Sequence, residues 1–184
     1  MSEIASTGQL RMGLVRWMLV TVPAILLIGL SSASLVTTGG AGGWYAALAK
    51  PPGTPPDWLF PVAWTTIYVL LGVALAIVIN ARGARGRGIA IALFLVQMAA
   101  NVVWMPLFFG AHQVTAALVL IWVMVALAVA TTLLFGRIRS TAAWLMVPYL
   151  VWLCYAGMLT WGIDRLNPEA ETLVPSGATT QIAL

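Results

Sequence analysis

Five long stretches without a charged residue dominate this sequence. They run over residues 17–36, 59–81, 89–110, 114–135 and 141–163. A helix that crosses a lipid bilayer needs about 20 largely apolar residues, and backbone in hydrocarbon must satisfy its own hydrogen bonds, as a helix does. The sequence therefore predicts an all-α integral membrane protein, a five-transmembrane-helix bundle whose surroundings are the lipid bilayer.

Composition excludes a soluble domain and argues against a nucleic-acid-binding one. Only 8% of the residues are charged, whereas a soluble domain carries roughly 25%. The net charge is +4, but the basic residues form short clusters between apolar stretches rather than one basic face. The single cysteine, Cys154, cannot form a disulfide within the chain.

The basic residues also predict the orientation in the membrane. With five spans, two positions (Lys50 and Arg165) fall on one side, and seven arginines share the other: Arg11, Arg16, Arg82, Arg85, Arg87, Arg137 and Arg139. Lys and Arg are enriched in cytoplasmic loops, so we expect a cytoplasmic N-terminus and an extracytoplasmic C-terminus. An alternative stays open for the first span, because its basic start and the small residues at 31–34 also resemble a cleavable signal peptide.

The expected organisation is a transmembrane domain, residues 17–163, between two tails. Residues 1–16 form a cytoplasmic tail, and residues 164–184, rich in Ser and Thr, are expected to be disordered. The loop 37–58 is long and rich in Gly and Pro. Long connections in compact domains are usually functional or disordered. Its aromatic residues favour a lid packed on the bundle, with a short helix over residues 44–49.

Groups that usually carry catalysis or metal binding are nearly absent. The one histidine, His112, lies in a tight turn, and no Cys/His cluster or phosphate-binding glycine loop is present. The spans contain no ionisable acid or base, which argues against ion-coupled transport. The sequence therefore predicts no metal site and requires no cofactor.

Aromatic and amide side chains are the chemistry that remains. Trp17, Trp44, Trp58, Trp144 and Trp161 fall at span ends, where interfacial tryptophans are usual, but Trp64, Trp104 and Trp152 do not. At 1.5 Å per residue, these three lie roughly 8–16 Å from the same membrane surface, beneath the long loop.

Helical spacing predicts which sides face inward. Gln97, Asn101 and Trp104 recur at i, i+4 and i+7, Trp64 and Tyr68 at i and i+4, and Pro148 and Trp152 likewise. Amides in hydrocarbon need partners, so this side of the third span should face the interior. Two interpretations remain: the amides join helices by hydrogen bonds, or they line a pocket for a flat, aromatic, apolar ligand.

The sequence resembles the TspO/MBR family of translocator and tryptophan-rich sensory proteins over about residues 20–168. The matching motifs, in order, are Lys50-Pro51, Pro55-Pro56-x-Trp58, Phe60-Pro61, Ala63-Trp64-Thr65, Tyr68, Gln97-x-x-x-Asn101-x-x-Trp104-x-Pro106-x-Phe108-Phe109-Gly110 and Val147-Pro148-Tyr149-x-x-Trp152. The resemblance implies a bacterial membrane protein, usually a homodimer, with a pocket under the first loop for porphyrins and related tetrapyrroles.

Site residues follow from the resemblance by matching position. It implies a pocket lined by Trp64, Asn101, Trp104, Phe108 and Trp152, to which spacing adds Tyr68, Gln97 and Pro148. A lid would contain Trp44, Pro55, Pro56 and Trp58. The sequence departs from the family at Gly53, where a tryptophan is frequent, at Leu159-Thr160 in place of Leu-Asn, and at Trp161 in place of the tyrosine of the sterol-associated pattern. Sterol binding is therefore not predicted.

Three functional hypotheses follow. The first is a membrane receptor or sensor that binds porphyrin-like tetrapyrroles, with haem ligation secondary because His112 is the one imidazole. The second is a light-dependent porphyrin-degrading enzyme in which Trp64 and Trp152 would be catalytic. The third is a tetrapyrrole transporter. For the homodimer, the small residues Gly88, Ala92, Ala99 and Ala100 permit close helix approach, between two copies or within one.

Overall fold

The computed structural model describes residues 7–34 and 41–173; residues 1–6, 35–40 and 174–184 lie outside the described part. Five long helices, each apolar and long enough to cross a bilayer, make up most of it. They are α1 (Thr7–Ser34), α3 (Leu59–Asn80), α4 (Arg87–Met105, continued by the π-helical turn η1, Pro106–Gly110), α5 (Val114–Ile138) and α6 (Ser140–Leu166). The described residues contain no strand, and the prediction of an all-α, five-helix membrane bundle is confirmed.

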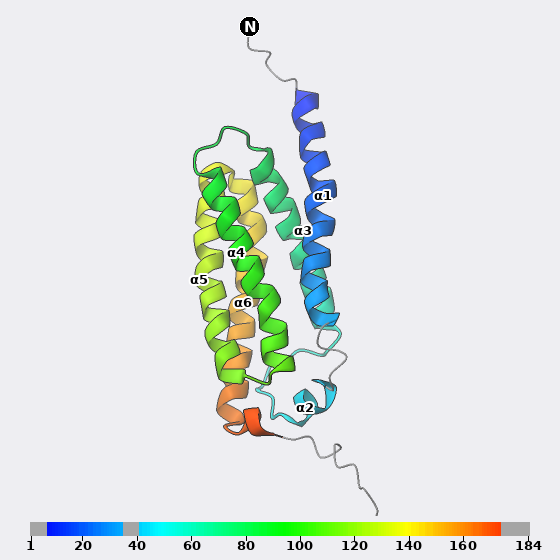
Figure 1. The fold of residues 1–184 in the computed structure, drawn as a ribbon, viewed down its shortest axis with the longest axis vertical. Helices are drawn as coiled ribbons and strands as arrows, with labels where there is room; N and C mark the ends of the chain where they lie inside the picture. Colours follow the sequence, from blue (N-terminus) through cyan, green and yellow to red (C-terminus); the bar gives the residue numbers. More distant parts are fainter. Residues whose placement is uncertain (1–6, 35–40, 174–184) are drawn as a thin grey trace, which may run out of the picture.

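The five helices run roughly side by side, with α1 packed along α3 (Figure 1). Their contact is close at Gly72, where an added Cβ would lie 2.7 Å from the Cα of Val22. The absent side chain lets the Thr21 hydroxyl donate a hydrogen bond of 2.7 Å to the Gly72 carbonyl. Short small-residue contacts of this kind hold helices together in lipid, where hydrophobicity does not.

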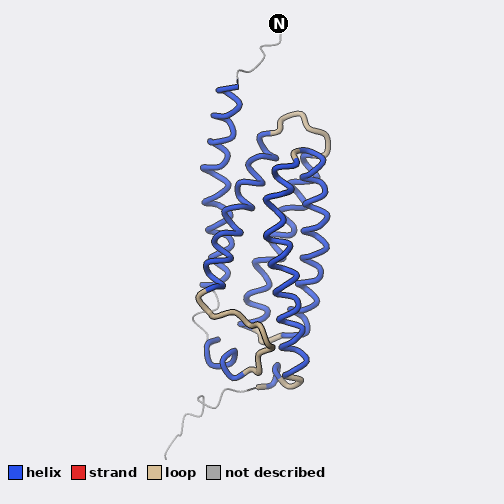
Figure 2. Tube along the Cα trace, turned by 180° about the vertical axis from the view of Figure 1, so that it is seen from behind, coloured by secondary structure: helices blue, strands red, loops and turns tan. Residues whose placement is uncertain are grey.

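The two ends of the bundle differ in what covers them. At one end lie the turn 81–86 and the junction between α5 and α6, which is a single extended residue, Arg139. At the other end lie the short helix α2 (Ala41–Ala47) and the 3-10 turn η2 (Ala170–Thr172), as seen from both sides in Figures 1 and 2. We call these the arginine end and the lid end.

Several boundaries differ from the sequence prediction. Helix α1 begins at Thr7 rather than near residue 17, and α6 continues to Leu166 rather than ending near 163, because polar residues can extend a helix once its apolar part has left the hydrocarbon. The third span widens into η1 at Pro106, whose missing N–H interrupts the regular ladder.

The expectation that the chain is disordered from residue 164 is wrong for the residues described. After α6 ends, the chain turns through η2, and the side chain of Ala170 is only 2% exposed. Ala170 and Leu173 pack with Trp44 and Leu48 of the lid segment, residues 41–58. Apolar burial therefore orders residues 167–173, while residues 174–184 lie outside the described part.

Candidate functional site

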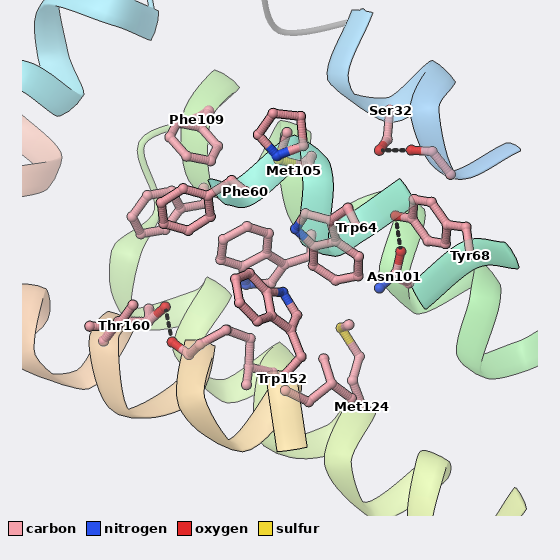
Figure 3. A pocket seen from close by; sticks show the side chains of 18 of the residues that line it. Ser32, Phe60, Trp64, Tyr68, Asn101, Met105, Phe109, Met124, Trp152 and Thr160 are labelled. Atoms are coloured by element: carbon pink, nitrogen blue, oxygen red, sulfur yellow. Dashed lines mark hydrogen bonds between the residues drawn. The ribbon is translucent and has the colours of Figure 1, made fainter. Parts of the chain in front are cut away.

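A cavity of about 270 Å³ lies inside the lid half of the bundle, and all five spans contribute to its wall. Tyr45 of α2 covers it from the lid. We call it the aromatic cavity (Figure 3). Its wall consists of Gly29, Leu30, Ser32, Tyr45, Phe60, Pro61, Trp64, Tyr68, Asn101, Trp104, Met105, Phe108, Phe109, Ile121, Met124, Trp152, Leu153, Ala156, Leu159, Thr160 and Ile163.

Aromatic rings from three spans form most of the enclosure. Trp64 of α3 stacks on Tyr68 at 5.3 Å between ring centroids and meets Trp152 of α6 edge to face at 6.2 Å. On another side Trp104 of α4 stacks on Phe108 of η1 at 5.1 Å. These are favourable arrangements for aromatic pairs, so the rings stabilise one another while leaving space between them.

A polar network closes the floor of the cavity. Tyr68 Oη donates a hydrogen bond of 2.8 Å to Asn101 Oδ1, and Asn101 Nδ2 donates one of 3.4 Å to Tyr149 Oη. The network joins α3, α4 and α6, and the Asn101 side chain is 3% exposed. Asn101 thus joins helices by hydrogen bonds, as the first of the two sequence interpretations has it, and its side chain also lines the cavity.

Gln97 behaves differently although it lies one helical turn away. It is fully buried, it does not line the cavity, and neither its Nε2 nor its Oε1 has a hydrogen-bond partner among the described residues. Gln97 therefore lies deeper than the site predicted for it, in the packed interior. A buried polar group without a partner costs about 1–3 kcal/mol.

The wall carries no acid or base with a charge. Its one ionisable group near the mouth is Tyr45, whose pKa is raised by burial and, to a lesser degree, by the negative charge of Asp57. The phenol therefore stays neutral at physiological pH. Among the residues described, no three His, Cys, Asp or Glu side chains lie together as metal ligands would.

The lid segment is fastened to the ends of α5 and α6. Trp44 is fully buried, donates from Nε1 to the Ala170 carbonyl at 2.8 Å and stacks on His112 at 4.3 Å. Asn167 accepts from the Ala49 N–H at 2.8 Å and donates to the Ala49 carbonyl at 2.9 Å. Trp44 thus anchors the lid from outside the cavity. Its ring packs edge to face on that of the wall residue Phe108, with 5.5 Å between the ring centroids.

Six predicted site residues come together on the wall, and the others do not. The six are Trp64, Tyr68, Asn101, Trp104, Phe108 and Trp152. Pro148 lies on the exposed side of α6, in line with the exposed Trp144 and Val151. Among the lid residues, Pro55 is half-buried, Pro56 is exposed and Trp58 is 65% exposed, and none of the three lines the cavity.

Sequence reasoning missed several wall residues. Phe60 stands four positions before Trp64 and contacts Trp152 at 5.9 Å, so helical spacing could have found it. The contribution of α1 had no such signal, because Gly29, Leu30 and Ser32 are not aromatic. Gly29 matters because a Cβ there would collide with the Tyr68 ring.

Comparisons with known proteins agree with the fold. A model of the TspO/MBR family matches residues 19–166. The chain is 36% identical to Protein CrtK of Rhodobacter capsulatus, covering 72% of this chain and 83% of that protein. It is 37% identical to the Tryptophan-rich sensory protein of Cereibacter sphaeroides, covering 80% and 96%.

A mammalian relative matches as well. The Translocator protein of Bos taurus is 36% identical, over 68% of this chain and 75% of its own length. The family match covers nearly the whole bundle, and the resemblance stated from the motifs is confirmed. This chain belongs to the TspO/MBR family.

Proposed function

We propose that this membrane protein is a receptor for porphyrin-like tetrapyrroles, which it binds in the aromatic cavity. The observation that carries the proposal is the convergence of Trp64, Trp104 and Trp152, from three different spans, on one uncharged space. Flat conjugated ligands bind by stacking on such rings and by burying apolar surface. The few polar groups of the wall would then orient the ligand.

The size of the cavity indicates how a tetrapyrrole would be accommodated. Its volume of about 270 Å³ is slightly below the range of roughly 300–1,000 Å³ typical of ligand pockets. A macrocycle would enter with one edge and widen the space by separating Trp64 from Trp152 and by displacing Tyr45. The hydrogen bonds between the lid and residues 167–170 would control that displacement.

Tryptophan fluorescence tests the proposal. Purified protein in detergent is titrated with protoporphyrin IX, and saturable quenching is expected because the cavity tryptophans would lie in contact with the ligand. The double variant Trp64→Ala, Trp152→Ala should lose at least tenfold in affinity. Its matched control is Trp144→Ala, Trp161→Ala, which also removes two indoles but from the exposed surface. Quenching that does not saturate, or equal protoporphyrin IX affinity in both double variants, would contradict the proposal.

The proposed orientation places the lid outside the cytoplasm. Six described arginines, Arg16, Arg82, Arg85, Arg87, Arg137 and Arg139, belong to segments at the arginine end, whereas α2 and η2 form the other end. In a Cys154→Ala background, Thr172→Cys in intact cells should react with a membrane-impermeant maleimide and Ser140→Cys should not. The reverse pattern would overturn this orientation.

We also propose that the chain forms homodimers through α4. Gly88, Ala92 and Ala99 lie on the exposed side of α4, and no atom of the described residues comes within 4 Å of a Cβ built at Gly88. The small residues are therefore left available for a second helix. Subunit counting by single-molecule photobleaching in liposomes should give a lower dimer fraction for Ala92→Leu than for the control Val119→Leu on α5; equal fractions would contradict the proposal.

A further inference from the structure

The ring nitrogen of Trp152 is a polar atom of the cavity wall that lacks a counterpart. Nε1 is buried and has no hydrogen-bond partner among the described residues. The indole extends from α6 into the middle of the cavity, towards Trp64 (Figure 3). An indole nitrogen carries a proton and can only donate, so what it lacks is an acceptor.

The hydroxyl groups of the wall differ from Trp152 because their protons are already engaged. Ser32 donates to the Gly29 carbonyl at 2.7 Å and Thr160 to the Ala156 carbonyl at 2.9 Å, each within its own helix. Tyr68 donates to Asn101 at 2.8 Å. Within the described part of the chain, Trp152 Nε1 is thus the buried wall donor that has no acceptor.

The rings of Trp64 and Trp152 meet edge to face, with 6.2 Å between their centroids. A ligand larger than the space of about 270 Å³ has to part these rings, and its own atoms then come next to Nε1. Since no charged side chain lines the wall, a charged ligand group would be buried there without compensation, which is strongly unfavourable. A neutral hydrogen-bond acceptor can pair with Nε1 and avoids the cost of burying a charge.

We infer that Trp152 selects ligands whose buried edge carries a neutral hydrogen-bond acceptor, a carbonyl oxygen or an imine nitrogen. The inference rests on the proposed function and narrows its ligand class. Open-chain oxidised tetrapyrroles carry terminal carbonyls at an edge, whereas closed porphyrins offer their imine nitrogens only through the face of the ring. The reduced porphyrinogens present pyrrole N–H donors instead and are not flat. The cavity should therefore accept the oxidised compounds and discriminate against the reduced ones.

Three small probes isolate the effect of the acceptor. Fluorene, 9-fluorenone and carbazole share a flat three-ring frame, and they carry at the same position a methylene group, a carbonyl acceptor and an N–H donor respectively. Their affinities for the full chain in detergent are measured by equilibrium dialysis. The same measurements are made on Trp152→Phe, which keeps an aromatic ring but lacks the N–H group.

The quantity compared is the ratio of fluorenone to fluorene affinity. Differences in partitioning into detergent cancel when this ratio in the wild type is divided by the ratio in the variant. A second variant carries 3-benzothienylalanine at position 152, in which sulfur replaces the ring N–H with little change of shape. Trp144→Phe is the matched control, since Trp144 is 73% exposed and does not line the cavity.

One neutral hydrogen bond should make this affinity ratio about 3- to 10-fold higher in the wild type and in Trp144→Phe than in either variant at position 152. Carbazole should show no such gain over fluorene. An unchanged ratio in the position-152 variants, or no binding of fluorenone at all, overturns the inference. If protoporphyrin IX nevertheless gives saturable quenching, the proposed function survives; if it gives none, the proposed function fails on its own test.

Discussion

The two halves of this bundle are built from the same five helices, yet one is solid and the other is hollow. Towards the arginine end the interior is filled: Val78, Ala90, Phe94, Phe135 and Ala142 are all fully buried. Phe94 and Phe135 stack there at 5.7 Å across α4 and α5. Towards the lid end the same helices carry Trp64, Trp104 and Trp152, whose rings line the aromatic cavity.

The difference comes from how side chains are paired across the helices. In the solid half, large rings face small residues or each other, so volume is filled as in other protein interiors. In the hollow half, Trp64 and Trp152 from different helices meet edge to face, and the wall also contains a small residue, Ala156. Stability should therefore reside mainly in the solid half and ligand recognition in the hollow half.

The largest effect should come from Phe94→Ala. Removing a fully buried ring from a filled region should lower the free energy of unfolding by about 3–5 kcal/mol, as measured by reversible unfolding in mixed micelles. Trp64→Ala removes more atoms, but from a half-buried side chain beside existing space, so its cost should be clearly smaller.

Phe94→Leu serves as the control for volume, because an apolar replacement of similar size should cost less than about 1.5 kcal/mol. If Trp64→Ala destabilised the protein as much as Phe94→Ala, the division between a stabilising half and a binding half would not hold.

An intermediate effect is expected where the halves meet, at the Tyr68–Asn101–Tyr149 network. Asn101→Leu would leave two buried hydroxyl groups without their partner and should destabilise the protein by about 1–3 kcal/mol. Gln97→Leu, one turn away, removes an amide that has no hydrogen-bond partner among the described residues and should be neutral or stabilising in the same unfolding measurement. Equal losses in the two variants would show that the network contributes nothing.

The spans and much of the cavity wall could be predicted from sequence because both depend on local pattern. Charge-free length fixes the number of spans, and counting inward from their ends places Trp64, Trp104 and Trp152 at similar depth. Helical spacing correctly grouped Asn101 with Trp104. It could not predict that Asn101 has hydrogen-bond partners and Gln97 has none among the described residues. The partners of Asn101 are Tyr68 and Tyr149, which belong to other helices and lie at the depth of Asn101.

What the sequence did not reveal depends on contacts between distant segments. The order of residues 167–173 requires Trp44 to meet Ala170, 126 positions away, and nothing in the composition of the tail indicates that contact. The empty volume itself has no sequence signature either. The space lies between side chains of all five spans, so it depends on how the helices pack against one another and not on the spacing of residues within any one of them.

The smallest effect should come from Asn167→Ala, which tests whether the lid is held from outside the hollow half. Loss of the paired hydrogen bonds to Ala49 should increase lid opening about 5- to 10-fold, seen as a loss of protection in hydrogen exchange of the Ala49 amide. Thr172→Ala is the matched control, because its hydroxyl donates to the nearby Glu169 carbonyl, and unchanged protection in Asn167→Ala would contradict the role. Asn101 and Asn167 are both asparagines that join distant segments, but the Asn167 pair is exposed. Water can replace its bonds when they break, so the structure should yield at the lid long before it yields at the floor.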